Sequence, residues 1–260
     1  MKRLISCVLS ACLWFSAMNV IACEKDELAG KVLTFSGYST KIEKIIKMFL
    51  EMMNSELFVN FSDQEKLDAS QIIFSYVSKG TLMSNVIKKI SQGLTLEEMR
   101  TLLAWYESEI SERLKEMEKT SMNEEALMMA YQNTENLIKE HADRLPLVQV
   151  IAQSSRSEEL MQKVKQFYMD IFFIMNGTPV SKIESGAICE VSDGNAWEVL
   201  VMACLLHVYA NASNDDLEKL KTHVLSDVFV NLTELVLKAI DQTFAELRQQ
   251  LTDQFAYKVQ

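Results

Sequence analysis

The apolar positions along the chain recur at spacings of three and four residues, which is the period of one face of an α-helix. Only two prolines and seven glycines occur among the 260 residues, so few positions interrupt this pattern. The pattern predicts an all-α fold, a helical bundle. The expected helices cover residues 26–36, 40–54, 63–79, 81–92, 95–119, 123–140, 144–153, 157–175, 194–210 and 214–254, with one break expected in the last.

Glycines mark the ends of several predicted helices. Gly37, Gly80, Gly93 and Gly177 stand at expected helix ends, where a residue that tolerates positive φ is favoured. The most apolar helical segment is residues 167–175, FYMDIFFIM, which should lie at the centre of the core.

Residues 94–119 contain seven glutamates and the adjacent pair Trp105 and Tyr106. Thr95 and Glu98 have the spacing of a capping box, which starts a helix. An apolar seam then predicts a helix packed in a bundle; its members are Leu96, Met99, Leu103, Tyr106, Ile110, Leu114 and Met117. Leu102, Trp105 and Tyr106 are the candidates for a groove or interface, although large side chains at this spacing more often belong to a core.

A shift of 118 residues aligns the chain with itself in three separate segments. Residues 32–49 then match 150–167, residues 82–90 match 200–208, and residues 95–117 match 213–235. The shift predicts two helical pseudo-repeats, residues 24–140 and 141–260, packed as one compact unit.

The motif LTLEEM at residues 94–99, followed by LLAWYES at 102–108, resembles a bacterial family of exported helical proteins, the domain of unknown function 2059. LTFSG at residues 33–37 and the segment 147–177 are also similar to that family. The resemblance implies a helical fold and an envelope location, and it brings no catalytic residues. This chain has Glu109 and Ser111 where the family usually has proline and glycine. The absence of proline and glycine at these two positions predicts one continuous helix of about 25 residues over 95–119.

The first 22 residues have the pattern of an export signal. Lys2 and Arg3 precede an apolar run that ends in small residues, and Ala22 satisfies a cleavage site. Cys23 comes next, so the segment also fits a bacterial lipoprotein, in which this cysteine would carry the lipid. We therefore expect a periplasmic protein, either soluble or lipid-anchored.

Three cysteines would remain after cleavage of the signal: Cys23, Cys189 and Cys204. If Cys23 is acylated, Cys189 and Cys204 can form a disulfide in an oxidising compartment. The alternative for Cys204 is a small buried residue on a helix.

Charge limits the partners. Removing Lys2 and Arg3 leaves 24 basic against 36 acidic side chains, a formal charge of −12. Such a chain is not expected to bind nucleic acid through its general surface. Attachment to a membrane is expected only through a lipid on Cys23.

The sequence offers little recognisable chemistry. His223 and Asp227 lie one helical turn apart, and Cys204 and His207 have a spacing that two metal ligands can use, but no motif adds a third group to either pair. We therefore predict no catalytic residue, no metal and no cofactor.

A non-catalytic binding or protein-interaction module is the leading hypothesis, with an envelope protein as its partner. The alternatives are a carrier of a small apolar ligand between the repeats, and an enzyme with an unrecognised site near Tyr106, His207 or His223.

Overall fold

The computed structural model describes residues 23–53, 55–78, 80–121, 124–178 and 194–259. Within these residues the secondary structure is helical and contains no strand, which confirms the all-α prediction. Residues 23–35 are helical, and the elements that follow are α2 (Tyr38–Met52), η1 (Glu56–Phe58), α3 (Asp63–Ser78), α4 (Thr81–Gly93), α5 (Leu96–Tyr106), α6 (Glu109–Ser121), α7 (Glu124–Gln132), α8 (Thr134–Glu140), α9 (Leu145–Ser154), α10 (Ser157–Met175), α12 (Gly194–Val208), α13 (Asn214–Val224), α14 (Asp227–Gln254) and η2 (Ala256–Val259).

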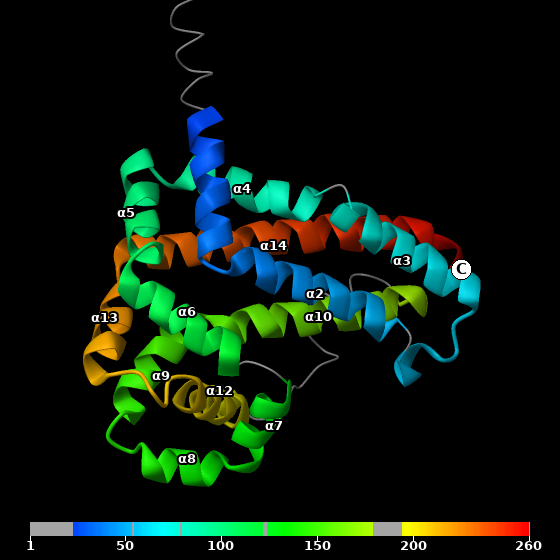
Figure 1. Cartoon of the computed structure of the whole chain (residues 1–260). Coiled ribbons are helices and arrows are strands. Elements are labelled where there is room, and N and C mark those ends of the chain that lie inside the picture. Colours follow the sequence, from blue (N-terminus) through cyan, green and yellow to red (C-terminus); the bar gives the residue numbers. More distant parts are fainter. Residues whose placement is uncertain (1–22, 54, 79, 122–123, 179–193, 260) are drawn as a thin grey trace, which may run out of the picture.

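The helices form a bundle with a smaller lobe beside it (Figure 1). The longest helix, α14, packs against α4, α10 and α3. The helices α5 and α13 stand across one end of this bundle (Figure 1). In the smaller lobe, α12 is surrounded by α7, α8 and α9. This arrangement places the ends of α5 and α13 together, where the candidate site lies.

The core runs through the middle of α10, as its apolar sequence predicts. Phe167, Ile171 and Met175 are buried there, and the Phe167 ring stacks on Phe244 of α14 with ring centroids 4.3 Å apart. Burial of large apolar side chains is the main favourable contribution to folding. The contact between α10 and α14 is therefore a central part of the core.

The prediction of one continuous helix over 95–119 is wrong. The capping box of Thr95 and Glu98 does start α5, but α5 ends at Tyr106 and α6 begins at Glu109. Ser108 starts the new helix, because its side-chain oxygen accepts a hydrogen bond from the backbone N–H of Ser111 at 3.2 Å. A serine cap thus breaks the helix without proline or glycine.

Two other predicted helices are also divided. The helix expected over 123–140 is interrupted at Asn133, between α7 and α8. The break expected within 214–254 falls at Leu225 and Ser226, where the Ser226 hydroxyl oxygen accepts a hydrogen bond from the N–H of Phe229 at 3.3 Å.

Three of the four glycines have the expected backbone conformation. Gly37, Gly80 and Gly177 have φ values of 75°, 63° and 74°. Gly93 differs, because it is the last residue of α4 and lies against α14. A Cβ atom at position 93 would clash with the side chain of Leu235, so this glycine is required for close helix packing.

Several predictions fall partly or wholly outside the described residues. The signal peptide at residues 1–22 and Cys189 belong to the segments that the structure does not describe. Cys23 is exposed, and Cys204 is half-buried on α12. Three predictions therefore stay untested: the lipidation of Cys23, the disulfide between Cys189 and Cys204, and the whole of residues 1–22 as a signal peptide. The two pseudo-repeats also stay a prediction. In the described part of the chain, no helix combines the length and the apolar character needed to cross a membrane.

Candidate functional site at the junction of α5 and α13

Four ring-bearing side chains meet where α5, α13 and α14 come together; we call them the aromatic junction. The imidazole of His223 stacks on the indole of Trp105, with centroids 4.4 Å apart and planes inclined by 12°. Tyr106 and Phe229 present their rings to the same imidazole at 5.5 and 5.0 Å in edge arrangements. Each of these geometries is favourable for ring pairs.

Helix ends hold His223 in place. Its backbone carbonyl accepts hydrogen bonds from the N–H of Ser226 at 3.0 Å and from the Ser226 hydroxyl at 2.6 Å. The same hydroxyl oxygen caps α14 three residues before Phe229. Ser226 therefore links the end of α13 to the start of α14, and it positions both His223 and Phe229.

Lys115 fixes the carboxyl end of α5, as Ser226 fixes that of α13. The ammonium group of Lys115 donates a hydrogen bond to the carbonyl oxygen of Tyr106 at 2.8 Å. It also lies 5.3 Å from the centroid of the Tyr106 ring and 5.6 Å from that of Phe35. Burial lowers the pKa of Lys115. A cation here is favourable both for the helix carboxyl end and for the ring faces.

Two polar atoms of the junction are buried and have no hydrogen-bond partner in the described structure: the hydroxyl oxygen of Tyr106 and Nε2 of His223. Burial lowers the pKa of His223 to about 4. Burial, and then the neighbouring Tyr38 hydroxyl, raise the pKa of Tyr106. At neutral pH the imidazole is thus uncharged and the phenol keeps its proton. Both atoms are closed to solvent, so a substrate cannot reach them in this conformation.

The structure brings together some of the predicted residues and separates others. Leu102 and Tyr106 are buried in the core, with exposed fractions of 1% and 6%, rather than lining an open groove. In the described structure these two side chains are core residues, and a groove or interface that involves them stays a prediction. Trp105 is half-buried beneath His223. Of the three positions suggested for an unrecognised enzyme site, Tyr106 and His223 meet, whereas His207 lies on α12.

Sequence analysis missed Phe229 and Lys115 as neighbours of this site. Each contact joins residues less than ten positions apart but on either side of a break between two helices, so the periodicity of a single helix does not indicate it. Although His223 and Asp227 lie one helical turn apart, Nε2 of His223 has no hydrogen-bond partner among the described residues. Ser226 had a local signal, because a serine before an apolar run is a typical N-cap.

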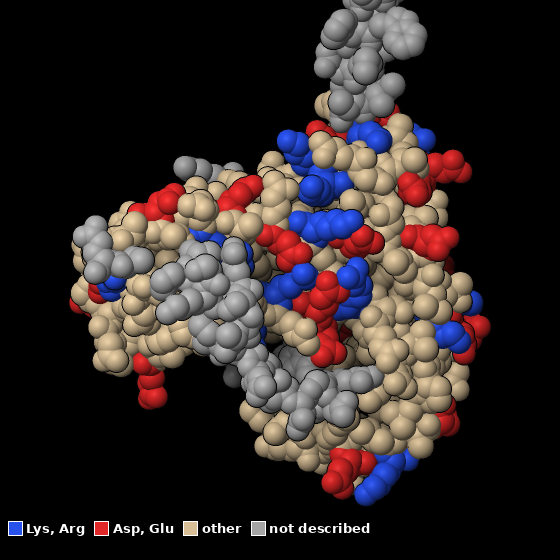
Figure 2. All heavy atoms as spheres, turned by 180° about the vertical axis from the view of Figure 1, so that it is seen from behind, with Lys and Arg blue, Asp and Glu red and all other residues tan. Residues whose placement is uncertain are grey.

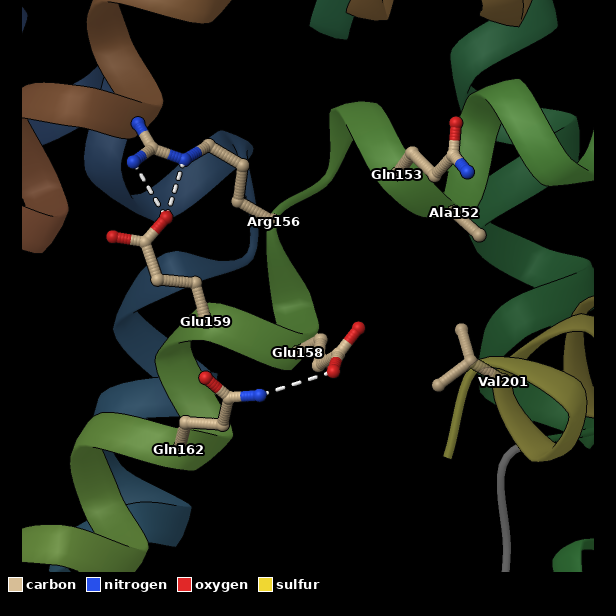
Figure 3. Close-up of a pocket in the computed structure, with 7 residues that line it drawn as sticks. All are labelled: Ala152, Gln153, Arg156, Glu158, Glu159, Gln162 and Val201. Carbon is tan, nitrogen blue, oxygen red and sulfur yellow. Dashed lines mark hydrogen bonds and ion pairs between the residues drawn. The ribbon is translucent and has the colours of Figure 1, made fainter. Parts of the chain in front are cut away.

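A separate cleft of about 400 Å³ lies between α10 and α12 (Figure 3). Glu158 and Gln162 point toward it from α10 and are joined by a hydrogen bond of 3.0 Å, while Val201 faces them from α12. Arg156 turns to the other side of α10 and pairs with Glu159 at 2.5 Å. Glu158, Glu159 and Gln162 bring polar groups to this cleft beside the apolar side chains of Ala152 and Val201, so its lining is mixed rather than apolar.

A second cleft of about 380 Å³ lies between α9 and α13; its lining is Asp143, Arg144, Pro146, Leu147, Val150, Asn214, Glu218 and Lys221. Figure 2 shows acidic and basic side chains intermixed on the back of the molecule. Among the described residues, no group of three or more His, Cys, Asp and Glu side chains has the arrangement of a metal site. The clefts therefore offer mixed polar surfaces with no dominant charge in their described linings.

Comparison of the chain with protein-family models, with curated proteins and with solved structures finds no match. The resemblance of residues 94–108 to the exported family accordingly stays a prediction.

Proposed function

We propose that this protein is an exported, non-catalytic protein-interaction module of the bacterial envelope. The observation that supports this proposal most is the closure of the aromatic junction. Tyr106 and His223 have the side chains best suited to acid and base chemistry, yet the Tyr106 hydroxyl oxygen and Nε2 of His223 are both buried. A general base has to come within hydrogen-bond reach of a substrate proton, which this packing prevents.

Exposed apolar side chains on α3 and beside η1 support an interaction role. Leu67 and Phe74 are two helical turns apart on one face of α3, with exposed fractions of 49% and 54%. Val59, next to η1, is 67% exposed. Large apolar side chains that remain in water near one another are typical of contact surfaces between proteins. We propose that an apolar segment of another envelope protein covers Leu67 and Phe74.

The two alternative functions have less support. A carrier of an apolar ligand needs an apolar cavity, whereas both clefts combine apolar side chains with charged ones, such as Glu158 in the first and Lys221 in the second. An enzyme needs an accessible reactive group, and the junction of Tyr106 and His223 is closed.

In-cell cross-linking tests this proposal on the full chain. A photoreactive amino acid at position 74 should give one discrete adduct with an envelope protein identified by mass spectrometry, and Leu67→Asp in the same chain should abolish it. Position 249, an exposed glutamine of α14, is the control and should give no such adduct.

Three results would contradict the interaction role. The interaction role is wrong if position 74 gives no adduct above the level at position 249. The carrier replaces it if native mass spectrometry finds a small molecule bound to the extracted protein. The enzyme replaces it if the purified protein turns over a generic hydrolase substrate and Tyr106→Phe removes that activity.

A further inference from the structure

Helix boundaries in the two halves of the chain coincide at the shift of 118 residues. The helices α5 and α13 both have 11 residues, and shifting the limits of α5 by 118 reproduces those of α13. The same shift carries the start of α6 at Glu109 onto the start of α14 at Asp227. Boundaries are sensitive to local sequence and to packing, so agreement at three successive boundaries goes beyond matched apolar stripes.

The capping residues coincide as well. Thr95 and Ser213 each accept a hydrogen bond from the backbone N–H three residues later, which starts α5 and α13. Ser108 and Ser226 do the same for α6 and α14. Both halves therefore build a helix, a serine break and a second helix with the same hydrogen bonds.

Trp105 and His223 are equivalent positions under this shift, and their rings stack directly on each other. In an interface between two equivalent units related by a two-fold axis, a residue touches its own counterpart only at the axis. The stack of Trp105 on His223 has this property. The positions equivalent to Tyr106 and Phe229 are Val224 and Ser111, which are small and buried. Each half therefore contributes one further ring to the junction, and the equivalent position in the other half holds a smaller buried side chain.

The helices that follow the two serine breaks, α6 and α14, each pack on the other half. In the first half, α6 leaves the junction and packs on α12 of the second half; in the second half, α14 packs on α4 of the first. The helix α12 overlaps the segment equivalent to α4. Side-chain contacts are present where each of these helices meets the other half. Leu235 of α14 lies against Gly93, and the Tyr209 hydroxyl donates a hydrogen bond to Glu118 of α6 at 2.5 Å.

We propose that residues 24–140 and 141–260 form an internal two-fold dimer whose axis passes through the stack of Trp105 and His223. The partner of each half is a second copy of the same unit, supplied by the same chain. Each half contributes the helix that follows its serine break, α6 or α14, to the packing of the other half, so neither half has a complete core by itself. The aromatic junction is then the centre of this interface, which accounts for its closure independently of the proposed interaction role.

Cleavage of the folded full chain between the halves tests this proposal. A specific protease site is inserted between Ala142 and Asp143, both exposed in the turn before α9. After cleavage, size-exclusion chromatography and native mass spectrometry should find the two fragments as a 1:1 complex with the mass of the uncut chain. Elution of the fragments as two separate folded monomers would overturn the proposal.

Matched substitutions in the cleaved complex test whether α6 and α14 contribute equally to the association of the two halves. Leu114 of α6 and Leu232 of α14 are equivalent and buried. Leu114→Ala and Leu232→Ala should each weaken association of the fragments roughly tenfold or more, because both remove apolar contacts from a crossing helix. Ile151→Ala is the control, since α9 packs on α10, α12 and α13 within its own half. A loss confined to Leu232→Ala, or a loss equal to that of the control for both variants, would contradict the two-fold arrangement.

Discussion

The imidazole of His223 lies among Trp105, Tyr106 and Phe229, and this burial disfavours its charged form. Its Nε2 atom is enclosed without a partner, so protonation would place a charge where neither water nor a carboxylate compensates it. The residue therefore contributes to stability only in its neutral form.

The pH dependence of stability follows from this burial. The pKa of His223 is about 4 in the folded chain, against an ordinary value of 6.5, so the unfolded chain binds more protons between these values. The contribution of His223 to stability is complete above pH 6.5 and is lost as the pH falls toward 4. The free energy of unfolding should fall by up to about 3 kcal/mol across this window.

Urea unfolding at pH 7.5 and at pH 4.5 measures this change. His223→Phe keeps a ring against Trp105 and should remove most of the difference between the two pH values, whereas His141→Gln, outside the junction, should retain it. An unchanged pH dependence in His223→Phe would show that other groups are responsible.

At the scale of elements, the ends of helices decide how the chain turns. Ser108 and Ser226 cap α6 and α14, and glycines with positive φ end other helices. The glycine at position 177 also has a tertiary role, because η2 at the carboxyl end packs over it. The Lys258 ammonium of η2 forms an ion pair with Glu65 of α3, and this contact and the Ser62 N–H lower the pKa of Glu65 to about 2.

Two glycine substitutions separate backbone strain from packing. Gly37 and Gly177 have nearly equal φ values, but a Cβ atom meets nothing within 4 Å at position 37, whereas at position 177 it would lie 2.6 Å from the carbonyl oxygen of Lys258. Gly37→Ala should lower the free energy of unfolding by about 1 kcal/mol and Gly177→Ala by about 3 kcal/mol. Equal losses in thermal or urea unfolding would mean that η2 does not pack on Gly177.

At the scale of the whole molecule, a buried ion pair joins α10 to α14. The Asp170 carboxylate is 1% exposed and accepts hydrogen bonds from Nε and Nη2 of Arg248 at 2.8 and 2.7 Å. Gln166 donates a third hydrogen bond to it at 2.8 Å. This arrangement compensates a carboxylate that would otherwise be costly to bury.

Removal of one partner of this ion pair should destabilise the fold more than removal of both partners. Arg248→Met should lower the free energy of unfolding by about 3 kcal/mol, because it leaves the buried carboxylate of Asp170 without its cation. Asp170→Ala combined with Arg248→Met should recover much of that loss. Urea unfolding of the single and double variants measures the difference. A double variant as unstable as the sum of the two single variants would show that the two residues act independently.

Local sequence patterns are enough to predict the all-α fold, most helix limits, the cap at Thr95 and the buried face of α10. These features depend on interactions within a few residues: the helical period of apolar positions, the reach of a capping side chain, and the freedom of glycine at positive φ. The break at Ser108 also had a local cause, but the helical pattern on both sides of it predicted continuity instead.

Which distant residues meet depends on the tertiary packing of the helices. The apolar stripe containing Tyr106 indicated burial but did not identify His223 as its neighbour, since many helix packings bury the same stripe equally well. Close fits such as Gly93 against Leu235 select one of them. The stack of Trp105 on His223 and the closure of the site at α5 and α13 follow from that selected packing, because contacts between distant segments depend on how whole helices fit together.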